Sequence, residues 1–227
     1  MSSFLHKQQH IDIFSTKLDI IRRDDEMAEE ARQYITNIYY KNYRATINPD
    51  PDIIIASRNK ETAALIACTG ISFVSPAQPL FSERYLSAPL DETILNQTGH
   101  LLARHQVVEI GSLASDNPNA AADLIRLMPI IAWFMGSKAI LCTSTRRLRK
   151  LLAFHHVPFC MLSEASPEKL SPDMRAAWGS YYDQAPQTGV ILLEKCGHLF
   201  NHFCGRLVFS EFEHIARSAL PSAQVAA

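Results

Sequence analysis

Apolar and polar residues in the first third of the chain alternate between the period of a strand and that of a helix. Residues 17–23 predict a short strand. Residues 24–44 begin with acidic residues, which favour a helix N-terminus, and predict a helix. Its apolar positions recur at helical spacing: Ala28, Ala31, Ile35 and Ile38. Residues 52–74 hold two apolar runs around a polar turn near Asn59 and Lys60, which predicts two neighbouring strands.

The middle of the chain repeats this alternation after a Pro-rich connection. Residues 75–89 form the connection, which has an aromatic and charged centre, and residues 90–105 predict a helix. Residues 106–115 predict a strand. Residues 117–136 predict a long apolar helix, in which Pro129 is expected to produce a kink.

The last part of the chain predicts shorter elements. They are a strand at 138–145, a helix at 146–156, a strand at 157–165, a loop-rich segment at 166–188, a strand at 189–196, a helical or mixed element at 198–220 and a frayed end at 221–227. This order predicts an α/β fold, a three-layer α-β-α sandwich around a mixed sheet. We expect one domain over residues 1–227, with 196–227 as a C-terminal helical extension.

Composition and charge narrow the class of protein. The 227 residues are 47% hydrophobic and 20% charged, with a formal net charge of -1, and lack the basic surplus of a nucleic-acid-binding protein. The longest apolar run is interrupted by Arg126 and Pro129 and is too short to span a membrane. Five cysteines, an odd number, favour reduced thiols, and the first residues lack the apolar run of a signal peptide. We expect a cytoplasmic protein without an integral membrane segment.

One acidic residue stands out in the strand predicted at 106–115. Glu109 lies between Val108 and Ile110, in a run that reads as buried. A carboxylate in such a place is unfavourable unless a neighbouring group pairs with it or the protein uses it in chemistry. A salt bridge with Arg84, Arg104 or another core cation is the structural alternative to a role in catalysis.

The start of the long apolar helix is a candidate anion site. A strand that leads through a short polar loop into a helix presents free N–H groups, and the helix dipole favours negative charge there. A diphosphate or a phosphopantetheine phosphate fits at residues 117–121. The alternative is an ordinary strand-to-helix turn, capped by Asp116 or Asn117.

Three segments resemble the thermostable hemolysin family. They are "LFSERYLSAPLDETI" from Leu80, "VVEIGSLAS" from Val107 and "WGSYYDQAP" from Trp178, in the family's order. The resemblance covers residues 31–190, most of the chain. The chain departs from the family's pattern in its first segment, where Arg84 separates Glu83 from Tyr85.

The element order also resembles the GCN5-related N-acetyltransferase (GNAT) superfamily, and within it the acyl-homoserine-lactone (AHL) synthases. Those enzymes have an aromatic and basic helix, a basic stretch and a strand with a glutamate. Here "RQYITNIYYKNYR" from Arg32, "SERYL" from Ser82 and "VVEIGS" from Val107 follow the same order. Leu113 follows Ser112 where the synthases have an arginine, which puts a homoserine-lactone product in doubt. The resemblance implies a GNAT-like mixed sheet and acyl transfer.

Acyl transfer to an amine needs a base, donors for the oxyanion and contacts that position the thioester. The resemblance implies that Glu109 acts as base or acceptor clamp, that Arg84 binds an acceptor carboxylate and that Tyr85 is a donor. The expected catalytic residues are Glu109, Tyr85 and Glu83. The expected substrate-binding residues are Arg84, Ser112, Leu113, Ala114, Ser115, Asn117, Trp178, Tyr181 and Tyr182. The alternatives are a surface loop at 83–85 and core anchors at Trp178 and Tyr182.

Two further segments have residues suited to binding. Residues 146–150, "RRLRK", suit an acidic acyl carrier protein and equally a solvated helix face. His198 and His202 have i,i+4 spacing, as zinc ligands on a helix do. Cys196 and Cys204 are two turns apart and do not converge with both histidines, so we expect no metal site.

The prediction is an N-acyltransferase that moves a fatty or related acyl group to the amine of a small acceptor, such as an amino acid. Its partners are an acyl-carrier-protein or coenzyme A thioester and the amine. The phosphopantetheine thioester is a co-substrate, and no cofactor is bound permanently. The alternative is a hemolysin that acts directly on membranes, through the segment 198–220. That segment has few lysines and arginines to attract anionic lipid.

Overall fold

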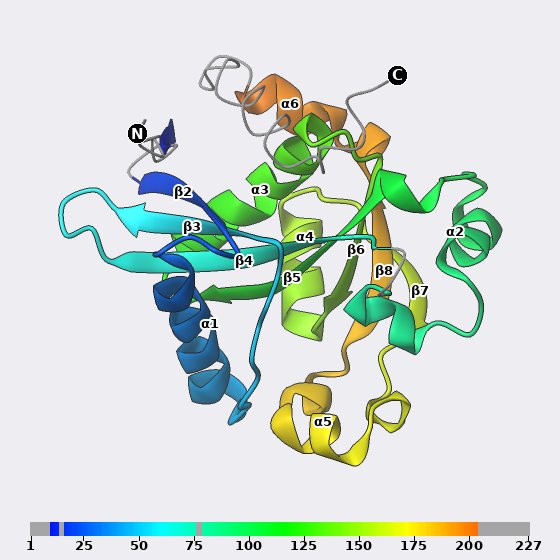
Figure 1. The fold of residues 1–227 in the computed structure, drawn as a ribbon. Helices are drawn as coiled ribbons and strands as arrows, with labels where there is room; N and C mark the ends of the chain where they lie inside the picture. Colours follow the sequence, from blue (N-terminus) through cyan, green and yellow to red (C-terminus); the bar gives the residue numbers. More distant parts are fainter. Residues whose placement is uncertain (1–9, 14–15, 76–78, 204–227) are drawn as a thin grey trace, which may run out of the picture.

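An eight-stranded sheet forms the centre of the structure, a computed structural model that describes residues 10–13, 16–75 and 79–203 (Figure 1). The strands are β1 (His10–Ile13), β2 (Thr16–Arg22), β3 (Ile53–Asn59), β4 (Leu65–Phe73), β5 (Val107–Ser115), β6 (Ala139–Ser144), β7 (Cys160–Glu164) and β8 (Gln187–Leu192). Their order in the sheet is β1-β2-β3-β4-β5-β6-β8-β7. All neighbours are antiparallel except β5 and β6, which are parallel. The sheet is therefore mixed, as the sequence predicts.

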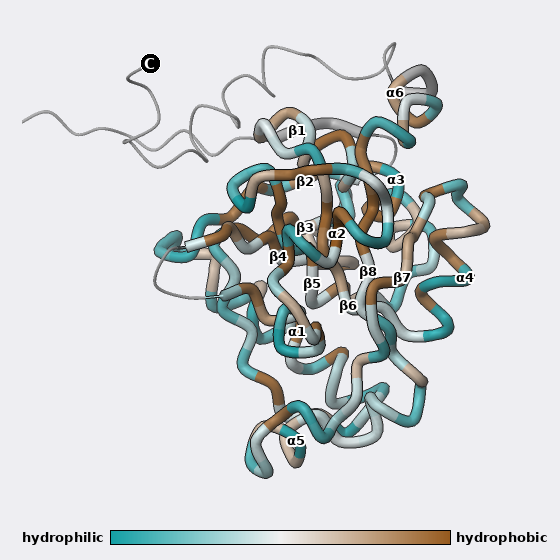
Figure 2. Tube along the Cα trace, turned by 90° about the vertical axis from the view of Figure 1, so that its right-hand side faces the viewer, coloured by the Kyte–Doolittle hydropathy of each residue, from teal (hydrophilic) through white to brown (hydrophobic). Residues whose placement is uncertain are grey.

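Helices cover both faces of this sheet. They are α1 (Ala28–Tyr43), α2 (Leu90–Thr98), α3 (Pro118–Phe134), α4 (Arg146–Phe154), α5 (Pro172–Ala177) and α6 (Gly197–Phe203). Buried side chains of α3 and α4 pack on one face, whereas α1 and α2 pack on the other face, over different strands. The most hydrophobic stretches of the chain run through the central strands and α3 (Figure 2). The predicted three-layer α/β sandwich is confirmed.

Several boundaries differ from the sequence prediction. The helix expected at 90–105 ends at Thr98, because Gly99 takes the left-handed conformation, with φ 75°, that closes a helix. The strand expected at 189–196 covers Gln187–Leu192 and is followed by a 3-10 turn, η5 (Leu193–Cys196). Strand β1 was not predicted from the sequence. Of the C-terminal extension expected at 196–227, residues 204–227 lie outside the described part of the chain.

Strands β5 and β6 pair over only three residues. Val107 to Glu109 match Ala139 to Leu141, and Glu109 is the last residue of β5 in this ladder. Beyond it the two strands separate: β5 continues beside β4, and β6 continues beside β8. A bulge on β5 lies next to this separation, since Ser112 has φ 55° and the register against β4 shifts.

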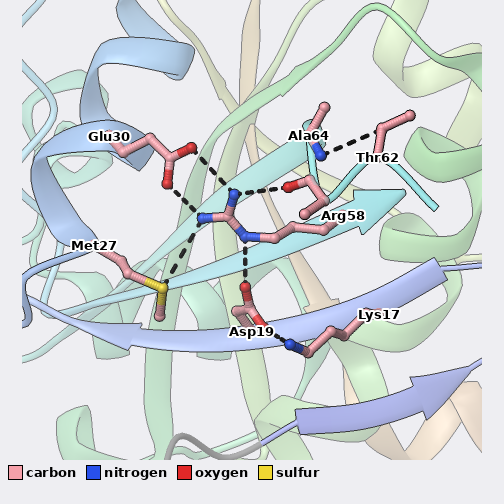
Figure 3. A network of polar contacts seen from close by, with 8 residues as sticks. Lys17, Asp19, Met27, Glu30, Arg58, Thr62 and Ala64 are labelled. Carbon is pink, nitrogen blue, oxygen red and sulfur yellow. Dashed lines mark hydrogen bonds and ion pairs between the residues drawn. The ribbon is translucent and has the colours of Figure 1, made fainter. Parts of the chain in front are cut away.

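A buried ion-pair network joins α1 to the β2–β3 ladder (Figure 3). Arg58 of β3 donates to Asp19 of β2 at 2.6 Å and to Glu30 of α1 at 2.5 Å. Arg58 also donates to the Ala63 carbonyl at 3.0 Å. The side chain of Asp19 is 2% exposed and that of Arg58 11%, so the arginine compensates a carboxylate that water does not reach.

The "WGSYY" segment docks onto the C-terminus of α1. Both the backbone N–H and the hydroxyl of Ser180 donate to the Tyr43 carbonyl, at 2.8 and 3.1 Å. Gly179 has φ 52°, and a Cβ there would lie 2.2 Å from the Tyr43 carbonyl oxygen. Only glycine fits this contact, which places Trp178 and Tyr181 over α1.

Replacement of Arg58 by methionine is expected to lower the free energy of unfolding by about 3 kcal/mol, because it removes the close cation of the buried Asp19 carboxylate and leaves only Lys17, 4.0 Å away and 37% exposed. Urea unfolding followed by circular dichroism measures the change. Arg23→Ala is the matched control, since the Arg23 side chain is 46% exposed and its pairs with Asp50 and Asp52 lie at the surface. The control should change stability by less than about 1 kcal/mol. Equal effects of both variants would contradict the importance of the buried network.

Gly179→Ala is expected to destabilise the protein more than Gly99→Ala. Both residues have positive φ, so alanine adds backbone strain of about 1–2 kcal/mol in each case. Around Gly99 there is open space, whereas at Gly179 the new methyl group also collides with the backbone of Tyr43 and Arg44. Thermal unfolding of the two variants compares these effects directly. Equal melting temperatures would show that the contact between Gly179 and α1 is not tight.

Candidate active site

A cavity of about 400 Å³ lies between β5 and β6, beyond the point where the two strands separate. The C-terminal part of α1, the start of α3 and α4 complete its wall. Its exposed lining is polar except for Pro118: Lys41, Asn42, Asp116 and Arg147. Its buried lining is mainly apolar and includes Ile125, Ile140, Leu152, Val157 and Ile191. Because exposed residues face solvent and buried ones the core, the cavity leads from a polar opening to an apolar interior.

The second half of β5 forms one wall of this cavity. Ser112, Leu113 and Ser115 line it, and so does Asn117 just beyond the strand. The bulge takes Ser112 and Leu113 out of the Cα register with β4. Ala114 belongs to the opposite face, where it packs in the same cluster as the buried side of α1. Four of the five substrate-binding residues expected at 112–117 therefore reach the cavity, and Ala114 does not.

Glu109 is buried beside the cavity and does not line it. Its carboxylate is held by η1 (Phe81–Tyr85), a 3-10 turn in the Pro-rich connection. One oxygen accepts a hydrogen bond from the Phe81 N–H at 2.7 Å. The other accepts from the Ser82 N–H at 2.9 Å and from the Ser82 hydroxyl. No cation of the described chain forms an ion pair with it, so the expected alternative of a salt bridge with Arg84 or Arg104 is wrong.

Burial sets the protonation behaviour of Glu109. The loss of hydration raises the pKa of its carboxyl group, and the nearby charge of Glu83 acts in the same direction. The hydrogen bonds from Ser82 and Phe81 oppose this change, because they stabilise the ionised form. The pKa remains above its ordinary value. A carboxylate with a raised pKa is a stronger base near neutral pH.

Glu83 is bound by hydrogen bonds that hold η1 in place. Arg104 donates two hydrogen bonds to it, each of 2.7 Å, in a bidentate pair. Glu83 also accepts from the Leu80 N–H at 2.9 Å, which closes the first turn of η1. Both oxygens are thus occupied and neither lines the cavity, so we assign Glu83 to holding η1 in place rather than to proton transfer.

Arg84 and Tyr85 also lie away from the cavity lining. The exposed Arg84 guanidinium stacks 5.6 Å from the centre of the Phe81 ring. Tyr85 is buried, and its hydroxyl lies 2.5 Å from that of Tyr182. Burial raises the pKa of Tyr85 well beyond the physiological range. The structure therefore places neither residue where the sequence-based roles of carboxylate clamp and oxyanion donor require it.

Of the three aromatic residues expected to bind substrate, Trp178, Tyr181 and Tyr182, only Tyr181 lines the cavity. Its hydroxyl donates to the Thr143 carbonyl at 3.3 Å. Trp178 packs against it, with ring centres 4.7 Å apart, and Tyr182 contacts the same cluster from the other side. Trp178 and Tyr182 are core anchors in this arrangement, which is the alternative that the sequence left open.

At the anion site expected at the start of α3, the backbone N–H groups of residues 119–121 are already hydrogen-bonded to Asn117. The Asn117 side chain accepts from the N–H groups of Asn119 and Ala120, at 3.0 and 3.1 Å. The Asn117 carbonyl accepts from Ala121, and Pro118 has no N–H. A phosphate here would have to displace the cap, so the alternative of a turn capped by Asn117 is confirmed.

Two cations at the opening of the cavity are better candidates for binding an anion than the start of α3. Lys41, near the end of α1, and Arg147, in the first turn of α4, both line the cavity and are exposed. Tyr43 also lines the cavity, hydrogen-bonded to Thr145 and close to Arg147; burial nevertheless raises its pKa. The end of α1 and the start of α4 therefore meet at the opening, where these two cations lie with one exposed carboxylate, Asp116.

Sequence reasoning missed the hydroxyl groups that surround Glu109. The Ser82 hydroxyl lies 2.8 Å from that of Thr143 on β6, and Thr143 lies 2.7 Å from the hydroxyl of Thr188 on β8. Thr143 also lines the cavity. The only signal in the sequence was that Ser82 lies inside the "FSERY" motif, because the two contacts join residues 61 and 45 positions apart and form only through the fold.

Metal-binding and membrane-spanning features are absent from the described residues. Residues 10–13, 16–75 and 79–203 contain no group of three or more His, Cys, Asp or Glu arranged to hold a metal ion. Over the same residues, every helix falls short of the length and hydropathy that crossing a bilayer requires. His202 and Cys204, weighed as zinc ligands, have no described side chains.

Comparison with solved structures identifies the fold. The N-acyl amino acid synthase FeeM from uncultured soil microbes superimposes with a TM-score of 0.54 at 12% identity, covering 81% of this chain and 94% of FeeM. A putative arylalkylamine N-acetyltransferase 7 of the yellow fever mosquito gives 0.53 at 8% identity, covering 82% and 94%. The AHL synthase LasI gives 0.50 at 8% identity, covering 78% and 90%. The fold is that of the GNAT superfamily and the AHL synthases.

Comparison of the sequence agrees with the motifs. A comparison with curated proteins gives no match. The thermostable hemolysin family matches residues 21–196, which include α1, the whole of β3 to β8 and the cavity between β5 and β6. The chain therefore belongs to the thermostable hemolysin family.

Proposed function

We propose that this protein is an N-acyltransferase that moves a fatty acyl group from a phosphopantetheine thioester to the amine of a small acceptor, such as an amino acid. The observation that carries the proposal is the cavity between β5 and β6, which has a polar opening, an apolar interior and a buried carboxylate beside it. FeeM, a protein of the same fold, is an N-acyl amino acid synthase. That likeness supports acyl transfer but does not define the donor or the acceptor.

The interior of the cavity favours a fatty acyl chain over an acetyl group. Its apolar wall comes from α3, α4 and the central strands: Ile125, Met128, Ile140, Leu148, Leu151, Leu152, Val157 and Ile191. Each methylene group that leaves water for such a surface contributes about 0.8 kcal/mol. A chain of several carbons therefore gains affinity that an acetyl group cannot.

The bulge on β5 is the proposed site of the thioester. Ser112 and Leu113 line the cavity and lie outside the register with β4, so their backbone groups are the natural donors for the developing oxyanion. Small residues at 111 and 112 allow the pantetheine arm to approach the backbone closely. The phosphate of the arm then lies toward the opening of the cavity, near Lys41 and Arg147.

Glu109 is the proposed general base. An amine attacks a thioester only in its neutral form, so the ammonium of the acceptor has to lose a proton. Glu109 stands at the end of the β5–β6 ladder, next to the start of the cavity, and its raised pKa suits this transfer. When the tetrahedral intermediate collapses, the thiolate of the carrier leaves and the amide forms.

Mass spectrometry tests the proposal. The purified full-length chain is incubated with acetyl, octanoyl and hexadecanoyl thioesters, each of coenzyme A and of acyl carrier protein, and a mixture of amino acids and simple amines. We expect an N-acyl product with the longer chains. Vesicle leakage without any thioester, and no acyl product, would instead support direct action on membranes.

Glu109→Gln is expected to lower turnover at least about 100-fold, which is the usual contribution of a general base. In the wild type, kcat/KM should fall as the pH drops through the pKa of Glu109, since only the ionised carboxylate accepts a proton. Because burial raises that pKa, the fall should lie above the ordinary range of glutamate. Glu92→Gln on the exposed start of α2 is the matched control. A variant Glu109→Gln that folds and keeps full turnover would refute the assignment.

Charge reversal at the opening of the cavity tests how the donor binds. Lys41→Glu and Arg147→Glu should raise the KM for the thioester about tenfold or more, with a smaller change in kcat, and the loss should shrink at high salt. Lys150→Glu is the control, because it lies on the same helix and is exposed without lining the cavity. Equal effects at positions 147 and 150 would indicate a diffuse charge effect.

A further inference from the structure

The hydroxyl of Ser82 connects Glu109 to a residue that lines the cavity. The hydroxyl of Ser82 binds a carboxylate oxygen of Glu109 on one side and lies 2.8 Å from the hydroxyl of Thr143 on the other. Ser82 is 0% exposed, whereas Thr143 lines the cavity. A proton that moves from a substrate in the cavity to Glu109 along these contacts passes through both hydroxyl groups.

The hydrogen-bond chemistry of the chain fixes its direction. An ionised carboxylate can only accept, so Ser82 has to donate its single hydroxyl proton to Glu109. Ser82 is then the acceptor in its contact with Thr143, and Thr143 donates to it. By the same argument Thr143 accepts from Thr188, at 2.7 Å. All the hydroxyl protons therefore point toward Glu109.

Thr143 keeps a free acceptor position in this arrangement. A hydroxyl oxygen has two lone pairs, and Thr188 uses one of them. Thr143 is partly exposed and lines the cavity, so the second lone pair is available to an N–H donor there. A protonated or attacking amine is such a donor.

We propose that Thr143 and Ser82 form a proton relay from the acceptor amine to Glu109. This inference rests on the proposed function and adds the route of the proton. The amine nitrogen gives a proton to the Thr143 oxygen, Thr143 gives its own to Ser82, and Ser82 gives its own to the carboxylate. One N–H bond breaks, one O–H bond forms on Glu109, and each hydroxyl group is restored.

The relay is held in place by groups outside it. The backbone N–H groups of Phe81 and Ser82 bind the same carboxylate that receives the proton, and the Arg104–Glu83 pair fixes η1. Ser82 is thus held by its own N–H bond to Glu109 and by the Arg104–Glu83 pair, which fixes its turn. These contacts keep the Ser82 hydroxyl close to both Glu109 and Thr143. Glu83 thus acts as a positioning residue, because it holds the turn that carries Ser82.

The ionisable groups that interact electrostatically with Glu109 do not interrupt the route. They are Glu83 and Tyr85 of η1 and Cys142 of β6. Burial raises the pKa values of Tyr85 and Cys142, and the charge of Glu109 adds to this, so both stay neutral near pH 7. Both carboxylate oxygens of Glu83 are bound by Arg104. Glu109 is therefore the group of this set that is suited to take the proton.

The relay is tested with three hydroxyl variants and Glu109→Gln in the acyl-transfer assay, using hexadecanoyl and octanoyl thioesters with amino acids. Thr143→Val has nearly the shape of threonine and leaves every contact between η1 and Glu109 in place. It should lower kcat about tenfold or more while the KM of the thioester changes little. Ser82→Ala should do the same. Thr143→Ser restores the hydroxyl group and should recover most of the activity.

Two readouts separate a relay from mere packing. The wild type should show a solvent deuterium isotope effect on kcat that is smaller or absent in Thr143→Val, and the acid limb of the pH profile that reports Glu109 should vanish in the same variant. Circular dichroism and melting temperature confirm that each variant folds. Equal losses in Thr143→Val and Thr143→Ser would overturn the relay, because the hydroxyl group would then not matter.

The outcomes for the base and for the relay are distinguishable. If Glu109→Gln is inactive while Thr143→Val and Ser82→Ala keep full turnover, Glu109 takes the proton directly and the relay is wrong. If a folded Glu109→Gln keeps full turnover, the proposed base fails, and the relay fails with it. Loss of turnover in Glu109→Gln, Thr143→Val and Ser82→Ala, together with recovery in Thr143→Ser, supports both the base and the relay.

Discussion

The hydrogen bonds between the Glu109 carboxylate and η1 connect the fold to the chemistry. A carboxylate within a central strand needs compensation, and here two backbone N–H groups and one hydroxyl provide it in place of a cation. The absence of a direct positive partner in the described chain has a consequence. The hydrogen bonds stabilise the ionised form, but burial still raises the pKa of the carboxyl group, and a raised pKa suits a general base. The same bonds fix η1 against the sheet, so the connection before α2 is part of the site.

The short ladder between β5 and β6 leaves room for the cavity. Parallel strands that paired along their whole length would leave no room for a ligand, but this pair ends at Glu109 and the bulge at Ser112 turns β5 further. The cavity opens where the ladder ends, and the two helices that follow these strands, α3 and α4, cover its interior with apolar side chains. The polar opening lies between the ends of α1 and α4. One interruption in the sheet thus produces a polar opening, an apolar interior and a carboxylate between them.

The sequence predicted what depends on local pattern. Hydrophobic periodicity identified the strands from β2 to β8 and the long helices, and the isolated charge in an apolar strand pointed to Glu109. The partners of these residues depend on tertiary contacts and could not be predicted. Arg104 pairs with Glu83 across 21 positions. Thr143 and Thr188 meet because β6 and β8 are neighbours in the sheet, and Ser82 reaches Thr143 because η1 packs against β6. At Asn117 both the anion site and the cap were compatible with the sequence, and only the direction of the side chain decides between them.

The fate of the thioester carbonyl tests the central claim most directly. A hexadecanoyl thioester labelled with ¹³C at the carbonyl carbon is mixed with the purified chain and a set of amino acids, and the reaction is followed by NMR. The account predicts that the thioester signal is replaced by an amide signal. A thioester signal that persists, or one that turns only into a free carboxylate, would contradict acyl transfer to an amine.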